Sequence, residues 1–166
     1  LNNVLIFEHN RRLSLRDHLT GLGNRSYFDE TLSCMKATAQ REDRPFSLLM
    51  LDLDNFKQVN DQHGHTEGDL VLKQFAKILR EALRSNDYVF RFGGVEFMLL
   101  LAHSNSLKPS LVAQRIIDMT CLDQLMMRHH VTTSIGFTNW KSGDCNSSMI
   151  ERADKALYHA KDHGKN

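Results

Sequence analysis

The sequence has almost no net charge, because 21 Lys and Arg residues stand against 20 Asp and Glu residues and leave a formal charge of +1. This balance removes any global electrostatic argument for nucleic acid or a membrane surface as a partner. Hydrophobic residues make up 41% and charged residues 25% of the 166 positions, which excludes a long disordered chain. The length suits one domain, since domains most often have about 100–150 residues.

Long hydrophobic runs are also missing. The most apolar stretches, residues 46–51 and 97–102, have the length of strands and fall short of the ~18–20 residues that a membrane span needs. The chain begins with Leu1 rather than Met and shows no basic-then-apolar leader, so we expect a segment of a longer protein that has no direct membrane contact of its own.

Cysteine is scarce and scattered. Cys34, Cys121 and Cys145 have no paired spacing, so the sequence predicts a reducing compartment and no disulfide framework. They also lack the short spacers of a zinc site. We therefore expect a cytoplasmic segment, with the cytoplasmic end of a membrane-bound sensor as an open alternative for the full protein.

The spacing of the apolar residues predicts the order helix, strand, helix, hairpin, helix, strand, helix. Asn24 is the expected N-cap of the first helix. Residues 46–52 are apolar almost throughout and predict a strand that is buried on both faces. Residues 66–69 (Thr-Glu-Gly-Asp) have the pattern of a capping box before the second helix. Gly93-Gly94 separates the two short strands of a hairpin.

Pro109 is expected near the first turn of the next helix, the alternation over 131–137 predicts a half-buried strand, and Ser147 or Ser148 is expected to cap the last helix. Residues 1–15 have helical spacing and predict the end of a linker or signalling helix from an upstream region. Helices that alternate with strands around a central hairpin indicate an α/β (α+β) fold on a mostly antiparallel sheet. Such a fold alone gives no function.

Several acidic and amide residues stand where chemistry is expected. Asp52 ends a buried strand, where a carboxylate is costly without a cation or a donor, so a magnesium–nucleotide site and a structural cap explain it about equally well. Glu96 follows the hairpin turn and would meet Asp52 if the hairpin packs beside the first strand. Asn60 and Asp69 suit the edge of a guanine base, although the capping box also accounts for Asp69.

Charged pairs lie at two helix ends. Arg84 and Asp87 follow the second helix, and Lys161 and Lys165 lie at the end of the last one. The two lysines suit phosphate binding, but such a pair more often forms a solvated helix end, and Arg84 near a helix C-terminus suits the helix dipole.

Together these segments resemble the GGDEF domain family. The resemblance is carried, in order, by residues 17–25, 52–69, 91–97 (Arg-Phe-Gly-Gly-Val-Glu-Phe), 133–136 and 153–161. It implies a GGDEF domain over residues 16–166. The implied fold is a mostly antiparallel five-stranded central sheet wrapped by helices, similar to the palm of class III nucleotide cyclases, with the last edge strand absent or incomplete.

The resemblance also implies an activity. Two such domains, brought together as a homodimer through the upstream region, convert two GTP into cyclic di-GMP and two diphosphates, with Mg²⁺ or Mn²⁺ as the cofactor. The metal ligands implied by the family are Asp52, the Leu53 carbonyl and Glu96. The implied GTP-binding residues are Phe56, Lys57, Asn60, Asp69, Lys161 and Lys165, the last in place of the usual arginine. Arg84 and Asp87 match the family's inhibitory cyclic di-GMP site.

Val95 departs from the family pattern, which has Asp or Glu at this third motif position. That carboxylate binds metal in the family and is the usual candidate for the base, and valine can do neither. Loss of a general base alone costs about 10²–10⁴-fold in rate. Glu96 remains as the candidate catalytic carboxylate, but its side chain is expected on the opposite side of the strand from residue 95. We therefore expect a weak or absent cyclase reaction.

Three readings follow from Val95. The domain binds GTP or cyclic di-GMP and regulates another protein, or it is a weak cyclase that relies on Glu96, Asp52 or Asp54, or it is a working cyclase that an engineered change at Val95 has inactivated. A module of a different class, used only for dimerisation or partner binding, is the further alternative.

Overall fold

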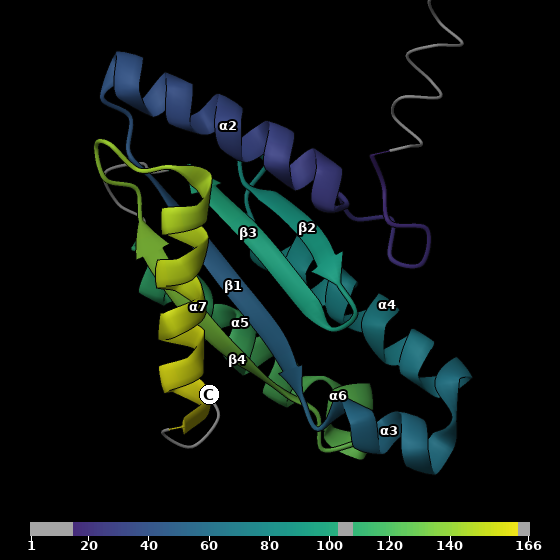
Figure 1. Cartoon of the computed structure of the whole chain (residues 1–166). Coiled ribbons are helices and arrows are strands. Elements are labelled where there is room, and N and C mark those ends of the chain that lie inside the picture. The colour runs from purple at the N-terminus through teal and green to yellow at the C-terminus, as the bar shows by residue number, and fades with distance from the viewer. Residues whose placement is uncertain (1–14, 103–107, 163–166) are drawn as a thin grey trace, which may run out of the picture.

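The structure is a computed structural model that describes residues 15–102 and 108–162 of the chain (Figure 1). The expected helix over residues 1–15 lies almost entirely outside the described residues. The elements follow one another as α2 (Arg25–Glu42), β1 (Phe46–Asp54), α3 (Phe56–His63), α4 (His65–Ala82), β2 (Tyr88–Gly93), β3 (Glu96–Ala102), α5 (Pro109–Leu122), α6 (Gln124–Arg128), β4 (Thr132–Asn139) and α7 (Asn146–Asp162). The predicted order is confirmed, and the short helices α3 and α6 are additions to it.

The sheet has the strand order β2-β3-β1-β4, and every pair of neighbouring strands is antiparallel. The expectation of five strands is therefore wrong for the part of the chain that the structure describes. The fifth was expected as an edge strand after the last helix, and the described residues end at Asp162. The hairpin β2–β3 lies directly beside β1, as the sequence analysis required for Glu96 to approach Asp52.

Helices cover the sheet on both faces. In Figure 1, α2 and α7 lie on the near face, and α4 and α5 lie behind the sheet. Alternate side chains of β1 and β3 pack into two hydrophobic cores, one on each face of the sheet. Leu49, Leu51 and Leu53 of β1 pack on the α4–α5 side, whereas Leu48 and Met50 pack on the α2–α7 side. This two-sided burial explains why β1 is apolar without alternation. None of the described helices combines the length and apolar character of a membrane span.

The cap of α2 is as predicted, since the Asn24 side chain accepts a hydrogen bond from the Tyr27 N–H. The predicted capping box is wrong: α4 begins at His65, so Thr66 and Asp69 lie inside the helix. The cause is Gly64, whose φ of +83° makes a sharp elbow between α3 and α4. Asn60 and Asp69 therefore both lie on helices.

The predicted cap of the last helix is also wrong. Helix α7 begins at Asn146, which places Ser147 and Ser148 inside its first turn. The predicted start of α5 is confirmed, because Pro109 occupies its first turn, where a missing N–H costs no helical hydrogen bond.

Candidate functional site

Asp52 is held near the end of β1, between β3 and β4. It lies directly opposite Glu96 in one ladder and opposite Ser134 in the other. Its Oδ2 forms an ion pair with Nζ of Lys161 from α7, whereas its Oδ1 is buried and has no hydrogen-bond partner. A buried carboxylate oxygen without a donor is costly, so this atom is suited to a cation that the protein itself does not supply.

Asp54 has a different environment from Asp52. Its side chain is buried, and Oδ2 accepts hydrogen bonds from the hydroxyls of Thr132 at 3.1 Å and Ser134 at 2.8 Å. These contacts join β1 to β4 and satisfy Oδ2 within the protein. Asp54 is thus a structural residue in this arrangement.

Val95 and Glu96 point away from each other at the tip of the β2–β3 hairpin. Val95 is half-buried and packs against the apolar core on the α4–α5 side, and its carbonyl accepts a hydrogen bond from the Leu53 N–H at 3.4 Å. Glu96 is exposed and, by its pairing with Asp52, lies on the α2–α7 side. The two carboxylates are therefore neighbours, whereas the side chain at position 95 lies on the other side of the strand.

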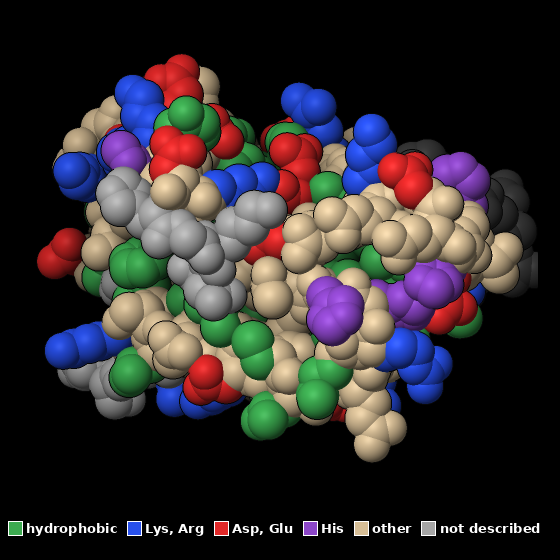
Figure 2. Space-filling model, turned by 90° about the horizontal axis from the view of Figure 1, so that it is seen from below, with side chains coloured by type: hydrophobic (Ala, Val, Ile, Leu, Met, Phe, Trp, Pro, Cys, Tyr) green, Lys and Arg blue, Asp and Glu red, His purple; other side chains and the backbone are tan. Residues whose placement is uncertain are grey.

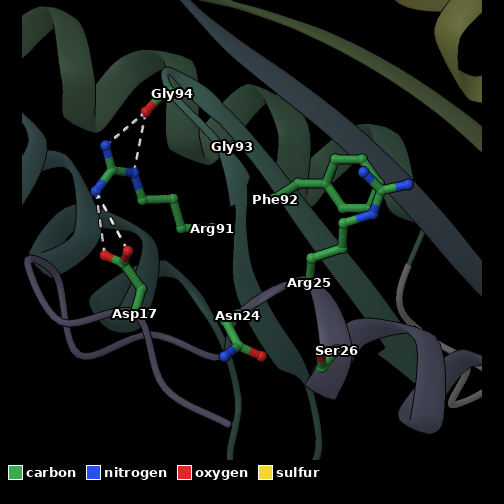
Figure 3. A pocket seen from close by; sticks show the side chains of 8 residues that line it. All are labelled: Asp17, Asn24, Arg25, Ser26, Arg91, Phe92, Gly93 and Gly94. Atoms are coloured by element: carbon green, nitrogen blue, oxygen red, sulfur yellow. Dashed lines mark hydrogen bonds and ion pairs between the residues drawn. The ribbon is translucent and has the colours of Figure 1, made fainter. Parts of the chain in front are cut away.

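Arg91 links the hairpin tip to the turn before α2 through hydrogen bonds. Its Nε and Nη2 donate to the Gly94 carbonyl at 2.9 and 2.8 Å, and its Nη1 donates to both oxygens of Asp17 (Figure 3). Burial opposes ionisation of the Asp17 carboxyl, but hydrogen bonds from Thr20 and Arg91 outweigh it and hold the pKa of Asp17 below its ordinary value. Sequence reasoning found Asp17 and Arg91 only as parts of motifs and missed that they meet.

A pocket of about 380 Å³ opens beside this ion pair, between the hairpin and the start of α2. The Arg25 guanidinium lies 4.7 Å from the centroid of the Phe92 ring at its wall, as Figure 3 shows. The residues that line this pocket are Asp17, Asn24, Arg25, Ser26, Arg91, Phe92, Gly93 and Gly94.

The elbow between α3 and α4 brings Asn60 and Asp69 onto adjacent helices. Asn60 is half-buried on α3, and its side chain lies against the backbone of α4 at Gly68. Asp69 is the next residue of α4 and is exposed. Phe56 and Lys57 form the first turn of α3, where Phe56 packs on the core and Lys57 is exposed.

His129 contacts both helices of the α3–α4 elbow, and the sequence analysis assigned it no role. Its Nε2 lies 2.8 Å from Oε1 of Glu67 on α4, and its ring centroid lies 4.7 Å from that of His63 on α3. The side chain is only 3% exposed, and its Nδ1 is buried without a partner. Several histidine side chains gather on the face seen in Figure 2. No local signal in the sequence could have identified His129, because the partners of its ring, Glu67 and His63, are more than 60 residues away in the chain.

The turn at Arg84 and Asp87 lies at the far end of the sheet from Asp52. Asp87 accepts hydrogen bonds from the backbone N–H of Arg84 and of Ala102, so its carboxylate closes the turn and joins it to β3. Arg84 itself is exposed. A groove of about 550 Å³ begins next to this turn. Its lining residues are Cys34, Met35, Thr38, Arg44, Pro45, Phe46, Ser85, Asn86, Tyr88 and Ala102.

The candidate metal ligands form only part of a site. Oxygen ligands such as Asp52 Oδ1 suit Mg²⁺ or Mn²⁺. Across residues 15–102 and 108–162, however, no three His, Cys, Asp or Glu side chains come together as a metal-binding cluster. Lys165 lies outside the described residues, so Lys161 is the one predicted phosphate lysine whose place is known.

Comparison with known proteins identifies relatives of this arrangement. Residues 14–166 match the family described as diguanylate cyclase, GGDEF domain. The chain is 38% identical to the diguanylate cyclase DgcS of Shewanella oneidensis over all of its residues and 56% of that protein. It is 37% identical to the bifunctional diguanylate cyclase/cyclic di-GMP phosphodiesterase MucR of Pseudomonas aeruginosa, over 93% of this chain and 23% of MucR. The chain thus spans about half or less of these relatives.

Solved structures show the same architecture. The coiled coil and GGDEF domain of DgcB from Caulobacter crescentus, in complex with c-di-GMP, superposes with a TM-score of 0.85 at 30% identity, over 99% of this chain and 89% of that one. The diguanylate cyclase SiaD of Pseudomonas aeruginosa, in complex with its activator SiaC, gives a TM-score of 0.83 at 35% identity, over 98% and 65%.

Proposed function

Because the chain belongs to the GGDEF family of diguanylate cyclase domains, we propose that it binds GTP and cyclic di-GMP as a signalling domain whose own cyclase reaction is weak or lost. The observation that carries the proposal is the hairpin tip. There Val95, half-buried against the core, supplies no carboxylate to the motif, and Asp52 retains a buried oxygen without a partner.

The reaction needs two copies of the domain, each with one GTP. The 3′-hydroxyl oxygen of each ribose bonds to the α-phosphorus of the other nucleotide, the bond to diphosphate breaks, and each hydroxyl proton must go to a base. Mg²⁺ held by Asp52 and the Leu53 carbonyl would neutralise charge that develops on the phosphates. Lys161 adds a positive charge beside Asp52, and Asn60 and Asp69 are the candidate readers of the guanine edge.

Glu96 is the only carboxylate of the hairpin motif, and its position limits what it can do. It faces Asp52 across the ladder, so it can contribute negative charge near a cation. A side chain at position 95 would lie on the opposite side of the strand, so Glu96 does not substitute for it. We therefore propose a loss of about 10²–10⁴-fold relative to a domain with a carboxylate at position 95.

Cyclic di-GMP binding is proposed separately, at the turn of Arg84 and Asp87. This turn lies at the opposite end of β3 from Val95, and the adjoining groove of about 550 Å³ offers a further guanidinium, that of Arg44. Arg guanidinium groups bind phosphates and pair with guanine edges through forked donors. The change at Val95 therefore leaves this site unaffected.

The test of catalysis compares this chain with Val95→Glu and with the uncharged control Val95→Gln. Cyclic di-GMP formation from GTP and Mg²⁺ is measured by chromatography at high protein concentration, because two domains must meet. We expect product from Val95→Glu and little or none from the other two proteins. Comparable rates for all three would show that position 95 is not the missing group, and GTP binding without turnover in all three would favour a purely regulatory domain.

The test of the second site is titration of cyclic di-GMP into Arg84→Glu. A charge reversal of an exposed lysine on α4, Lys77→Glu, is the control, since this side chain is 64% exposed. We expect a large loss of affinity for Arg84→Glu alone. Equal affinities would refute the assignment of Arg84, and an absence of both GTP and cyclic di-GMP binding would favour a module used only for dimerisation or partner binding.

A further inference from the structure

We infer that Gly68 is a positioning residue for the guanine site, because its missing side chain determines where Asn60 presents its amide. A Cβ atom placed on Gly68 would lie 2.0 Å from Oδ1 and 3.1 Å from Cγ of Asn60. The amide of Asn60 thus occupies the space that any other residue at position 68 would fill. This inference rests on the proposed role of Asn60 and Asp69 in reading guanine.

The backbone conformation does not call for glycine at this position. Gly68 is absent from the residues with positive φ, in contrast to Gly64, whose φ of +83° forms the elbow. Glycine inside a helix costs about 1 kcal/mol relative to alanine. Gly68 is also buried, so the residue is explained by the close approach of another group, which here is the Asn60 side chain.

The contact fixes Asn60 relative to Asp69. Asp69 follows Gly68 directly on α4, so an Asn60 amide that lies against Gly68 lies next to the helical turn that carries the carboxylate. The elbow is short and hydrogen-bonded, because Gly64 N–H donates to the Asn60 carbonyl at 2.9 Å and Gly68 N–H donates to the Gly64 carbonyl at 3.2 Å. A methyl group at position 68 would therefore displace the Asn60 amide from its place beside the helical turn that carries Asp69.

The experiment is a double-mutant cycle of Gly68→Ala and Asn60→Ala, with direct calorimetric titration of GTP and of ATP. Loss of one hydrogen bond to the base should weaken GTP binding by about tenfold in Asn60→Ala. We expect Gly68→Ala to weaken it about equally, and the double variant to bind no more weakly than Asn60→Ala. The GTP-to-ATP affinity ratio should fall in all three, which a merely structural effect would not cause. Gln62→Ala, an exposed amide on α3, is the control and should bind as the parent does.

Thermal unfolding gives the second readout and covers a failure of Gly68→Ala to fold. Without the Asn60 amide, the nearest remaining neighbour of the added methyl group is the Phe56 ring end at 3.1 Å, which needs a small shift. Alanine is also the better helix former, so Gly68→Ala should raise the melting temperature in the Asn60→Ala background and lower it in the parent.

The inference is overturned if the two substitutions have additive effects on GTP affinity, if Gly68→Ala binds GTP as the parent does, or if Gly68→Ala is destabilising in both backgrounds. Failure of the proposed function has a different signature. GTP affinity and the GTP-to-ATP ratio would then be unchanged by Asn60→Ala itself, and the positioning role of Gly68 would be refuted together with the guanine site.

Discussion

Arg91 and Asp17 lie 74 residues apart in the sequence and form an ion pair of 3.2 Å that ties the hairpin to the turn before α2. The same guanidinium also holds the Gly94 carbonyl at the hairpin tip. The N-terminal turn and the tip that carries Val95 are therefore parts of one hydrogen-bonded unit.

Arg91→Lys is expected to lower the free energy of unfolding by about 1–3 kcal/mol, because lysine keeps the charge but loses the fork that reaches two acceptors. Urea unfolding measures the change. Arg41→Lys is the matched control, since Arg41 pairs with Glu42 at a site where its side chain is 71% exposed, and its effect should stay within about 0.5 kcal/mol. Equal effects at the two sites would contradict a specific role for the fork of Arg91.

The ion pair between Asp144 and Arg152 is expected to make the folded domain less stable in acid. Hydrogen bonds from Arg152 outweigh burial and hold the pKa of the Asp144 carboxyl well below its usual range. The folded state then binds fewer protons than the unfolded state, so the stabilisation is complete above the ordinary pKa of about 4 and is lost as the pH falls below it. Asp144→Asn should flatten the fall in unfolding free energy between about pH 5 and about pH 2. An unchanged pH dependence in that variant would assign the effect to other carboxylates.

Gly136→Ala is expected to destabilise the domain by about 2–4 kcal/mol. A Cβ atom on Gly136 of β4 would lie 2.1 Å from the Leu157 backbone nitrogen and 2.4 Å from the Ala153 carbonyl oxygen, both of α7. The helix that carries Lys161 would have to move. Gly93→Ala is the control, because its nearest neighbour is 3.8 Å away, and chemical denaturation should show little change there.

His129→Ala should cost about 2–4 kcal/mol, since it removes a buried ring and the partner of Glu67. Glu67→Gln retains a side-chain oxygen that can accept from Nε2 and should cost less than about 1 kcal/mol. Thermal or urea unfolding distinguishes the two. If both substitutions cost the same, the contact with the Glu67 carboxylate matters more than the packing of the ring against His63.

Local pattern was enough to predict much of the fold. The apolar run of β1, the glycine hairpin and the Asn24 cap were correct because each depends on residues that are neighbours in the chain. The capping box failed because Gly64, two residues before Thr66, forms the elbow at which α4 begins.

The sequence by itself determined the family motifs, their order and the absence of a carboxylate at Val95, since these are properties of residue identity and spacing. Only the tertiary structure decided which groups meet. It paired Asp52 with Glu96 across the sheet and with Lys161 in an ion pair, and it placed hydroxyl groups of β4 within hydrogen-bond distance of Asp54. It also placed the Asn60 amide against Gly68. Such contacts join different elements, most of them far apart in the chain, so they depend on strand order and helix packing, which a local apolar pattern does not specify.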